Sequence, residues 1–145
     1  MKLSKKSEYG LRALLELTTL ADGKTSLQRH EIAERQHIPV EFLEQILLAL
    51  KRAGIVSSRR GMKGGYALIK RPDEVTVGQV IRILDGPLAP ISCVSKTAYQ
   101  KCRDCPYADK AQCPVQQVMG PVRDAIAGIL DNYTLEDFAS GHRES

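Results

Sequence analysis

The sequence of 145 residues contains no hydrophobic run as long as a membrane span, which requires about 20 consecutive apolar residues. No apolar stretch with a cleavage-site pattern follows the charged N-terminal residues, as it would in a secretory signal. No nucleophile stands with a recognisable base, and the glycine-rich residues 61–65 do not lie between a strand and a helix, as a phosphate-binding loop would. We therefore expect a cytoplasmic protein that is neither a membrane protein nor an enzyme.

Cysteine is absent from the first 92 residues, and all cysteines then fall within 21 residues of one another. They are Cys93, Cys102, Cys105 and Cys113. In a reducing cytoplasm such a cluster indicates metal binding or thiol chemistry more than a disulfide scaffold. Thiolates select zinc or iron-sulfur centres over hard cations, and a C-x2-C pair is common in zinc sites, so the spacing alone leaves both metals open.

The charge is divided unevenly along the chain. Residues 1–72 carry 14 Lys or Arg and 7 Asp or Glu, whereas residues 73–145 carry 7 and 10. The two parts therefore have net charges of +7 and −3, which sum to the +4 of the whole chain. A basic half is suited to a polyanion, because Lys and Arg near phosphates release counterions. Charge alone leaves a solvated charged surface as the alternative.

Apolar residues recur at three- and four-residue intervals in the N-terminal half, which predicts a succession of helices. The first covers residues 4–20, a short second one covers residues 27–36, and a third starts at Pro39 and ends before Gly54. Two strand-like segments, 55–58 and 66–69, flank a basic glycine-rich tip and predict a hairpin. A further helix is expected from Thr76 to Leu84.

Residues 88–112 show little periodicity, so we expect a bound metal to order them. Apolar residues then repeat at threes and fours from Val115 to Tyr133 and predict a long amphipathic helix, in which Pro121 is expected to cause a kink. A capped turn or short helix is expected at 134–138, followed by a frayed end from Ser140.

Helix, short helix, tight turn, helix and basic hairpin form the layout of a winged helix-turn-helix, whose third helix enters the major groove of DNA. The exposed face of that helix would carry Glu41, Glu44, Gln45, Lys51 and Arg52. Gln can pair with adenine and a carboxylate can accept from the cytosine amino group, so these are candidate base readers. The hairpin tip would bring to the phosphates or the minor groove Arg59, Arg60 and Lys63.

Two features of this surface have other interpretations. Glu41 and Glu44 repel phosphate, so we expect them to exclude wrong sequences rather than to add general affinity. The hairpin could instead only cap the core, with arginines that serve solubility.

Five segments resemble the IscR and NsrR type of iron-sulfur transcription regulators. They are residues 1–4 (MKLS), 42–46 (FLEQI), 57–61 (SSRRG), 64–68 (GGYAL) and 132–137 (NYTLED), and the similarity spans nearly the whole chain. The resemblance implies a homodimer with crossed C-terminal helices on a palindromic operator in double-stranded promoter DNA. Each cysteine loop would lie next to the other subunit's DNA-binding domain. The resemblance also implies that the recognition helix contacts bases and that Arg60 is the arginine of the wing.

The family pattern has three cysteine ligands, and Cys93 and Cys113 match the first and the last of them. Cys105 is favoured over Cys102 as the middle ligand.

The fourth ligand differs among family members. Some use a histidine three residues after the last cysteine, but that position is Gln116 here, a poor ligand. Others use a carboxylate near the N-terminus, where this chain has Glu8. Glu8, from the same or the partner subunit, and Cys102 are therefore the candidate fourth ligands, although Glu8 can equally be a surface residue.

The expected fold is mainly α: a winged helix-turn-helix with a two-stranded β wing at residues 1–86, a cysteine-rich metal-binding loop at 87–113, and a long dimerisation helix with a tail at 114–145. The expected function is a homodimeric regulator whose promoter binding is controlled by an iron-sulfur cluster that senses redox state, nitric oxide or iron-sulfur status. A 2Fe-2S cluster is favoured over 4Fe-4S, with zinc as the alternative cofactor.

Two other functions stay open. One is a zinc- or thiol-based redox regulator without a cluster, in which Cys102 and Cys105 could form a disulfide. The other is an iron-sulfur carrier or electron-transfer protein, although such a protein has no need of a basic wing.

Overall fold

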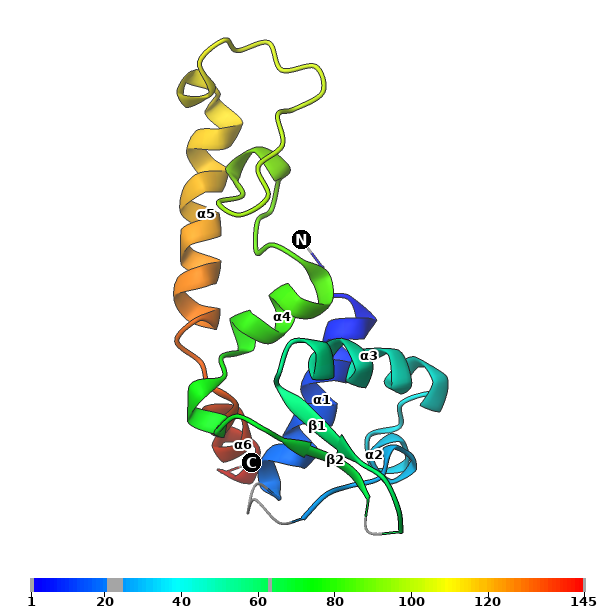
Figure 1. Ribbon diagram of the computed structural model, residues 1–145. Helices are drawn as coiled ribbons and strands as arrows, with labels where there is room; N and C mark the ends of the chain where they lie inside the picture. Colours follow the sequence, from blue (N-terminus) through cyan, green and yellow to red (C-terminus); the bar gives the residue numbers. More distant parts are fainter. Residues whose placement is uncertain (1, 21–24, 63, 145) are drawn as a thin grey trace.

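The computed structural model describes residues 2–20, 25–62 and 64–144, which form a mainly helical fold with one two-stranded sheet (Figure 1). The helices of the described residues are α1 Lys5–Thr19, α2 Arg29–Gln36, α3 Val40–Arg52, α4 Val77–Asp85, α5 Pro114–Leu130 and α6 Leu135–Glu144. The strands are β1 Val56–Arg59 and β2 Gly65–Leu68, and short 3₁₀ turns lie at η1 Pro72–Glu74, η2 Ser92–Val94 and η3 Lys110–Gln112. The expected mainly α class with a two-stranded wing is confirmed.

The core of the N-terminal domain lies between α1, α3 and α4. The apolar face of α3 is completely buried at Leu43, Ile46, Leu47 and Leu50. Each such side chain contributes roughly 1.5–3 kcal/mol to folding when it leaves water. Leu14 of α1 is fully buried against the same cluster. The three- and four-residue spacing in the sequence therefore identified the faces that pack.

The start of α2 differs from the prediction. Leu27, expected to open the second helix, instead pairs with Tyr66 of β2 in an antiparallel bridge, with Leu27 N donating to Tyr66 O at 2.9 Å. The Leu27 side chain is buried in the core, so its backbone is drawn to the wing and α2 begins only at Arg29. One bridged residue has no period, so the sequence could not show it.

The wing is an antiparallel hairpin in which Val56 pairs with Leu68 and Arg59 with Gly65. After it, α4 begins at a capping box: Gln79 N donates to Thr76 Oγ1 at 3.1 Å, and Thr76 N donates to Gln79 Oε1 at 2.9 Å. These bonds satisfy backbone groups that a helix N-terminus leaves unpaired.

The C-terminal end of the long helix α5 lies near α4, and its N-terminal part extends away from the N-terminal domain, with the cysteine-bearing segment at that far end (Figure 1). It runs through Pro121 without interruption, so Pro121 does not mark its start. Pro114 occupies the first helical turn, where a missing N–H costs nothing. None of the described helices is long and apolar enough to cross a membrane.

The last helix, α6, turns back and packs against α1. Leu135 is fully buried in the core, and its N–H donates to Val75 O at 2.9 Å. The expectation of a frayed end from Ser140 was wrong, because the helix that Leu135 anchors extends to Glu144.

Candidate DNA-binding surface and cysteine pocket

The exposed side of α3 carries the residues that the sequence predicts to read bases. Glu41, Gln45 and Lys51 are exposed and Glu44 is partly exposed, whereas Leu43 is buried on the opposite side. The helix therefore offers polar side chains to solvent, as a helix that enters the major groove requires.

Two of these residues already have partners within the chain. Glu44 Oε1 forms an ion pair with Nη1 of Arg29, the first residue of α2. Lys51 Nζ donates to Ser58 Oγ at 2.7 Å, which ties the end of α3 to β1. A phosphate contact by Lys51 would have to replace that hydrogen bond, so Lys51 contributes to the position of the wing as well as to the basic surface.

The wing tip presents Arg59 and Arg60 to solvent. The predicted contact Lys63 lies outside the described residues. The tip is closed tightly at Gly64, where a Cβ would overlap the carbonyl oxygen of Arg59. Within the described part of the chain, neither arginine has an ion-pair partner, so both guanidinium groups are available to an anionic ligand.

All four cysteines line one pocket of about 600 Å³ at the far end of α5. Cys102 is exposed and the other three are partly buried, and all are free thiols. Two cations line the same pocket, Lys101 and Lys110. No three His, Cys, Asp or Glu side chains in residues 2–20, 25–62 and 64–144 converge closely enough to hold a metal ion. The donor chemistry thus fits a soft metal centre, but the loop must tighten to close around one.

Side chains of α5 fix the cysteine segment to the helix. Gln116 Nε2 donates to the carbonyl oxygen of Cys93 at 3.0 Å, and Arg123 Nη1 donates to that of Val94 at 2.6 Å. The sequence had marked Gln116 only as a poor ligand, so its anchoring role was missed. The backbone at Cys93 is therefore connected directly to α5 by a hydrogen bond.

Glu8, the other candidate for the fourth ligand, lies on α1 and not in this pocket. Its carboxylate forms an ion pair with Lys5 at 3.1 Å and is partly exposed. Within one chain, Cys102 is therefore the candidate that shares the pocket with the other thiols.

The solvent side of α5 is apolar, and no residue of this helix is buried. Its large exposed apolar residues follow a three- and four-residue spacing at first, and they are Val115, Val118, Val122 and Ile129. Two others pack on the N-terminal core, Ile126 and Leu130. One face of α5 thus packs against the N-terminal domain. The face with the exposed apolar residues has no partner within the described chain.

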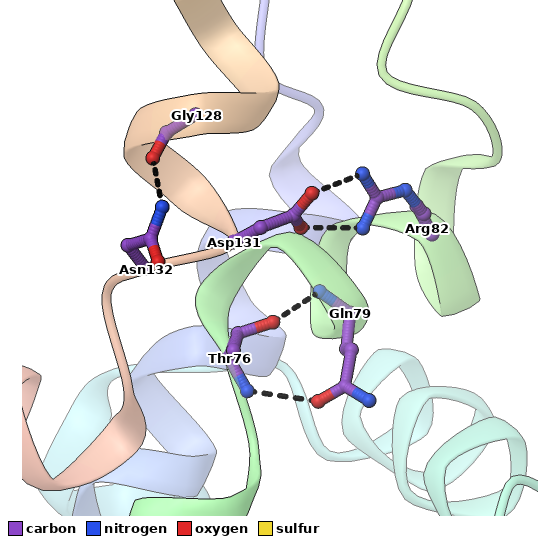
Figure 2. A network of polar contacts seen from close by, with 6 residues as sticks. All are labelled: Thr76, Gln79, Arg82, Gly128, Asp131 and Asn132. Carbon is purple, nitrogen blue, oxygen red and sulfur yellow. Dashed lines mark hydrogen bonds and ion pairs between the residues drawn. The ribbon is translucent and has the colours of Figure 1, made fainter. Parts of the chain in front are cut away.

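A polar joint connects the C-terminal end of α5 to α4 (Figure 2). Arg82 Nη1 and Nη2 donate to the two carboxylate oxygens of Asp131 at 2.6 and 2.8 Å. The hydrogen bond from Arg82 lowers the pKa of Asp131, and the same bond raises the pKa of Arg82. The two residues are 49 positions apart, so no local sequence pattern indicates the pair.

Comparison with known sequences gives consistent matches over almost the whole chain. The family model Rrf2, described as iron-dependent transcriptional regulator, matches residues 3–141. An rrf2-like HTH-type transcriptional regulator of Rhodobacter capsulatus is 44% identical over 137 residues, covering 93% of this chain and 90% of that protein. The HTH-type regulator CymR of Bacillus subtilis is 36% identical over 141 residues, covering 97% and 91%.

Solved structures agree with these matches. CymR, described as the global cysteine regulator of B. subtilis, superposes with a TM-score of 0.78 at 34% identity and covers 97% of both chains. IscR of T. potens superposes with a TM-score of 0.77 at 30% identity, covering 99% of this chain and 90% of that one.

Proposed function

Because the chain belongs to the Rrf2 family of transcriptional regulators, we propose that it is a homodimer whose binding to promoter DNA is controlled by an iron-sulfur cluster. Membership makes it a DNA-binding regulator and not an enzyme. The homodimer and the cluster are the inferred parts. The observation that carries the inference is that all four cysteines line one pocket.

On DNA, α3 would lie in the major groove with Glu41, Glu44 and Gln45 at the base edges. Arg59 and Arg60 would extend from the wing to phosphates or into the minor groove. Lys63 is proposed to add to the same contact, and Lys51 to reach the DNA backbone near the end of α3.

The cluster would be held by the pocket thiols Cys93, Cys105 and Cys113, with Cys102 as the fourth ligand. When bound, it would supply a redox-active centre that oxygen, nitric oxide or iron shortage can alter, with 2Fe-2S favoured over 4Fe-4S. Glu8 of the partner subunit is the alternative fourth ligand, and zinc is the alternative metal.

The chain's own residues would transmit the state of the pocket. Gln116 and Arg123 donate to backbone oxygens of the cysteine segment, so a movement of that segment would be transmitted to α5. At the other end of α5, Asp131 is bonded to Arg82 of the DNA-binding domain. The cysteine segment, α5 and α4 are therefore joined by polar contacts within one chain, and α4 packs against the reading helix α3.

The proposed dimer follows from α5. Its exposed apolar residues lie on one side of a helix of 17 residues, and pairing with the same face of a second copy would remove them from water. A symmetric pair would also place two reading helices on one duplex, which matches a palindromic operator.

The proposal is tested by anaerobic purification of the full-length chain. We expect a coloured protein with iron and sulfide bound in amounts stoichiometric with the chain. We also expect that DNA binding, measured on a duplex selected from a random pool, changes when the cluster is removed with a chelator.

The variants Cys93→Ser and Cys113→Ser should each lose the iron. Comparing Cys102→Ser with Glu8→Gln then identifies the fourth ligand. Colourless protein with stoichiometric zinc, or DNA binding that is identical with and without cluster, would contradict it.

A second candidate is a thiol-based regulator without a cluster. It is favoured by the similarity to a cysteine regulator and by the exposed thiol of Cys102. In that case anaerobic protein would carry no metal, and oxidation of Cys102 and Cys105 alone would change DNA binding.

A further inference from the structure

The ion pair between Arg29 and Glu44 connects the two helices of the helix-turn-helix. We propose that Arg29 is a positioning residue that holds the Glu44 carboxylate where it reads a cytosine. This inference rests on the proposed contact of α3 with DNA. It adds a specificity-determining residue to which the sequence analysis gave no role.

The backbone positions of both residues are fixed by the core. Arg29 is the first residue of α2 and Glu44 lies in the second turn of α3, and the two helices pack against each other. Ile32 of α2 and Leu43 of α3 are fully buried beside them. The core therefore leaves only the two side chains free to move, and the ion pair between them fixes the position of both.

The pair offsets the electrostatic repulsion between the Glu44 carboxylate and the DNA phosphates. A carboxylate on a helix in the major groove faces the phosphates of both strands and is repelled by them. Arg29 supplies the compensating charge from α2, the helix that crosses the DNA backbone in this fold. Its contact is with Oε1 of Glu44, which leaves Oε2 to accept a hydrogen bond from the amino group of cytosine.

Exposure is consistent with this role. The side chains of Arg29 and Glu44 are 52% and 42% exposed, so the pair lies at the surface where DNA would arrive and not inside the domain. Glu41 has no ion-pair partner within the described chain, so its charge is uncompensated. The two carboxylates of α3 therefore differ: Arg29 holds Glu44 in position to accept a hydrogen bond, whereas no described residue holds Glu41 in this way.

The same helix supplies a matched control. Arg35, in the last turn of α2, pairs with Glu16 of α1 at 3.5 Å and is 50% exposed. It has the same residue type, helix and exposure as Arg29, but its partner lies on a different helix from α3. Arg35→Leu therefore reports what the loss of any arginine of α2 does to folding and to overall charge.

The test selects bound sequences from a randomised pool of duplexes about 30 base pairs long, which spans two half-sites. Wild type, Arg29→Leu, Arg29→Lys, Glu44→Ala and Arg35→Leu are compared at one salt concentration, after circular dichroism has shown equal helix content. We expect wild type to enrich cytosine at one position of each half-site. Glu44→Ala and Arg29→Leu should both reduce that preference by about tenfold at this same position. Arg29→Lys should restore part of it, and Arg35→Leu should leave it unchanged.

Two results would overturn the inference while leaving the proposed function intact. The first is uniformly weaker binding by Arg29→Leu, with an unchanged base profile and a salt slope reduced by about 1, which identifies a simple phosphate contact. The second is an altered profile in Arg29→Leu but not in Glu44→Ala, which means that Arg29 reads DNA itself. If wild type enriches no sequence at all, the proposed function fails first, and this inference fails with it.

Discussion

Gly78 leaves room on α4 for the carboxylate of Asp131, since a Cβ at position 78 would overlap Asp131 Oδ1. The end of α5 can approach α4 only because this residue has no side chain. The approach brings Asp131 within reach of Arg82 and lets Val77 N donate to Tyr133 O at 2.8 Å. The joint between the two parts of the molecule thus depends on a glycine as much as on an ion pair.

We predict that Gly78→Ala destabilises the protein, by about 1 kcal/mol or more in urea unfolding. In an ordinary helix interior, Gly→Ala stabilises by roughly 0.5–1 kcal/mol, so the sign of the change separates the two cases. Gly120→Ala is the control, because a Cβ at that position of α5 meets nothing within 4 Å. A stabilisation by Gly78→Ala equal to that of the control would show that the close approach is absent.

The ion pair itself should contribute in a pH-dependent way. The hydrogen bond from Arg82 lowers the pKa of Asp131 in the folded protein. The pair therefore contributes fully to the free energy of unfolding above the pKa that Asp has in the unfolded chain, about 3.9, and this contribution declines as the pH falls through the lower pKa of the folded state. Asp131→Asn should lower the free energy of unfolding at pH 7 by at most about 1 kcal/mol, because both side chains are more than one-third exposed and screened by solvent. Urea titrations at pH 7 and pH 3 check this. The difference from wild type should narrow at pH 3, and a constant difference would contradict the assignment.

The sequence predicted the helices in which apolar residues recur at a regular spacing. α1, α3 and α4 each have one buried face, and a buried face leaves a period in the chain. The wing was predicted from a basic glycine-rich tip between two strand-like segments. Leu27 was misassigned because an isolated bridge has no period. α6 was predicted too short because its apolar spacing is limited to Leu135, Phe138 and Ala139, and no apolar residue follows them.

The candidate site divides in the same way. The exposed residues of α3 and the cysteine cluster were visible in the sequence, because residue type and spacing express them. Contacts between distant segments were not. Arg82 with Asp131 and Gln116 with Cys93 form only when helices are placed in space, and neither residue type nor spacing marks them.

Gln116 should control access to the Cys93 thiol. Its side chain holds the Cys93 carbonyl oxygen, so Gln116→Ala frees the backbone there and should raise the rate at which Cys93 is alkylated a few-fold in metal-free protein. Mass spectrometry after a timed iodoacetamide pulse measures the rate at each cysteine. Gln117→Ala is the matched control, because its amide binds the Ala111 carbonyl oxygen instead. Equal rates in both variants at Cys93 would remove the anchoring role.

The exposed face of α5 predicts the oligomeric state. Val118→Lys would place a charge in the middle of the proposed interface and should convert the dimer to a monomer at micromolar concentration, measured by analytical ultracentrifugation. Ile69→Lys is a matched control, because both side chains are 58% exposed but Ile69 follows β2, away from α5. A dimer that survives Val118→Lys, or that Ile69→Lys disrupts equally, would place the interface elsewhere.

The wing arginines should act mainly on affinity and its salt dependence. Arg60 is exposed at the end of the hairpin and has no ion pair within the described chain, so its charge is fully available to phosphates. Arg60→Ala should weaken binding to every duplex and reduce the slope of log K against log salt by about 1. Fluorescence anisotropy at several salt concentrations measures both quantities.

Arg71→Ala provides the comparison for this prediction. Arg71 is also an exposed arginine near the wing, but its guanidinium is paired with Asp73 at 2.5 Å. Its charge is therefore already compensated, and removing it should change the salt slope much less than Arg60→Ala does. Equal slopes for the two variants would mean that long-range charge, and not contact by the wing, attracts the duplex. A changed base profile for Arg60→Ala without a changed slope would instead mean that the wing reads groove shape.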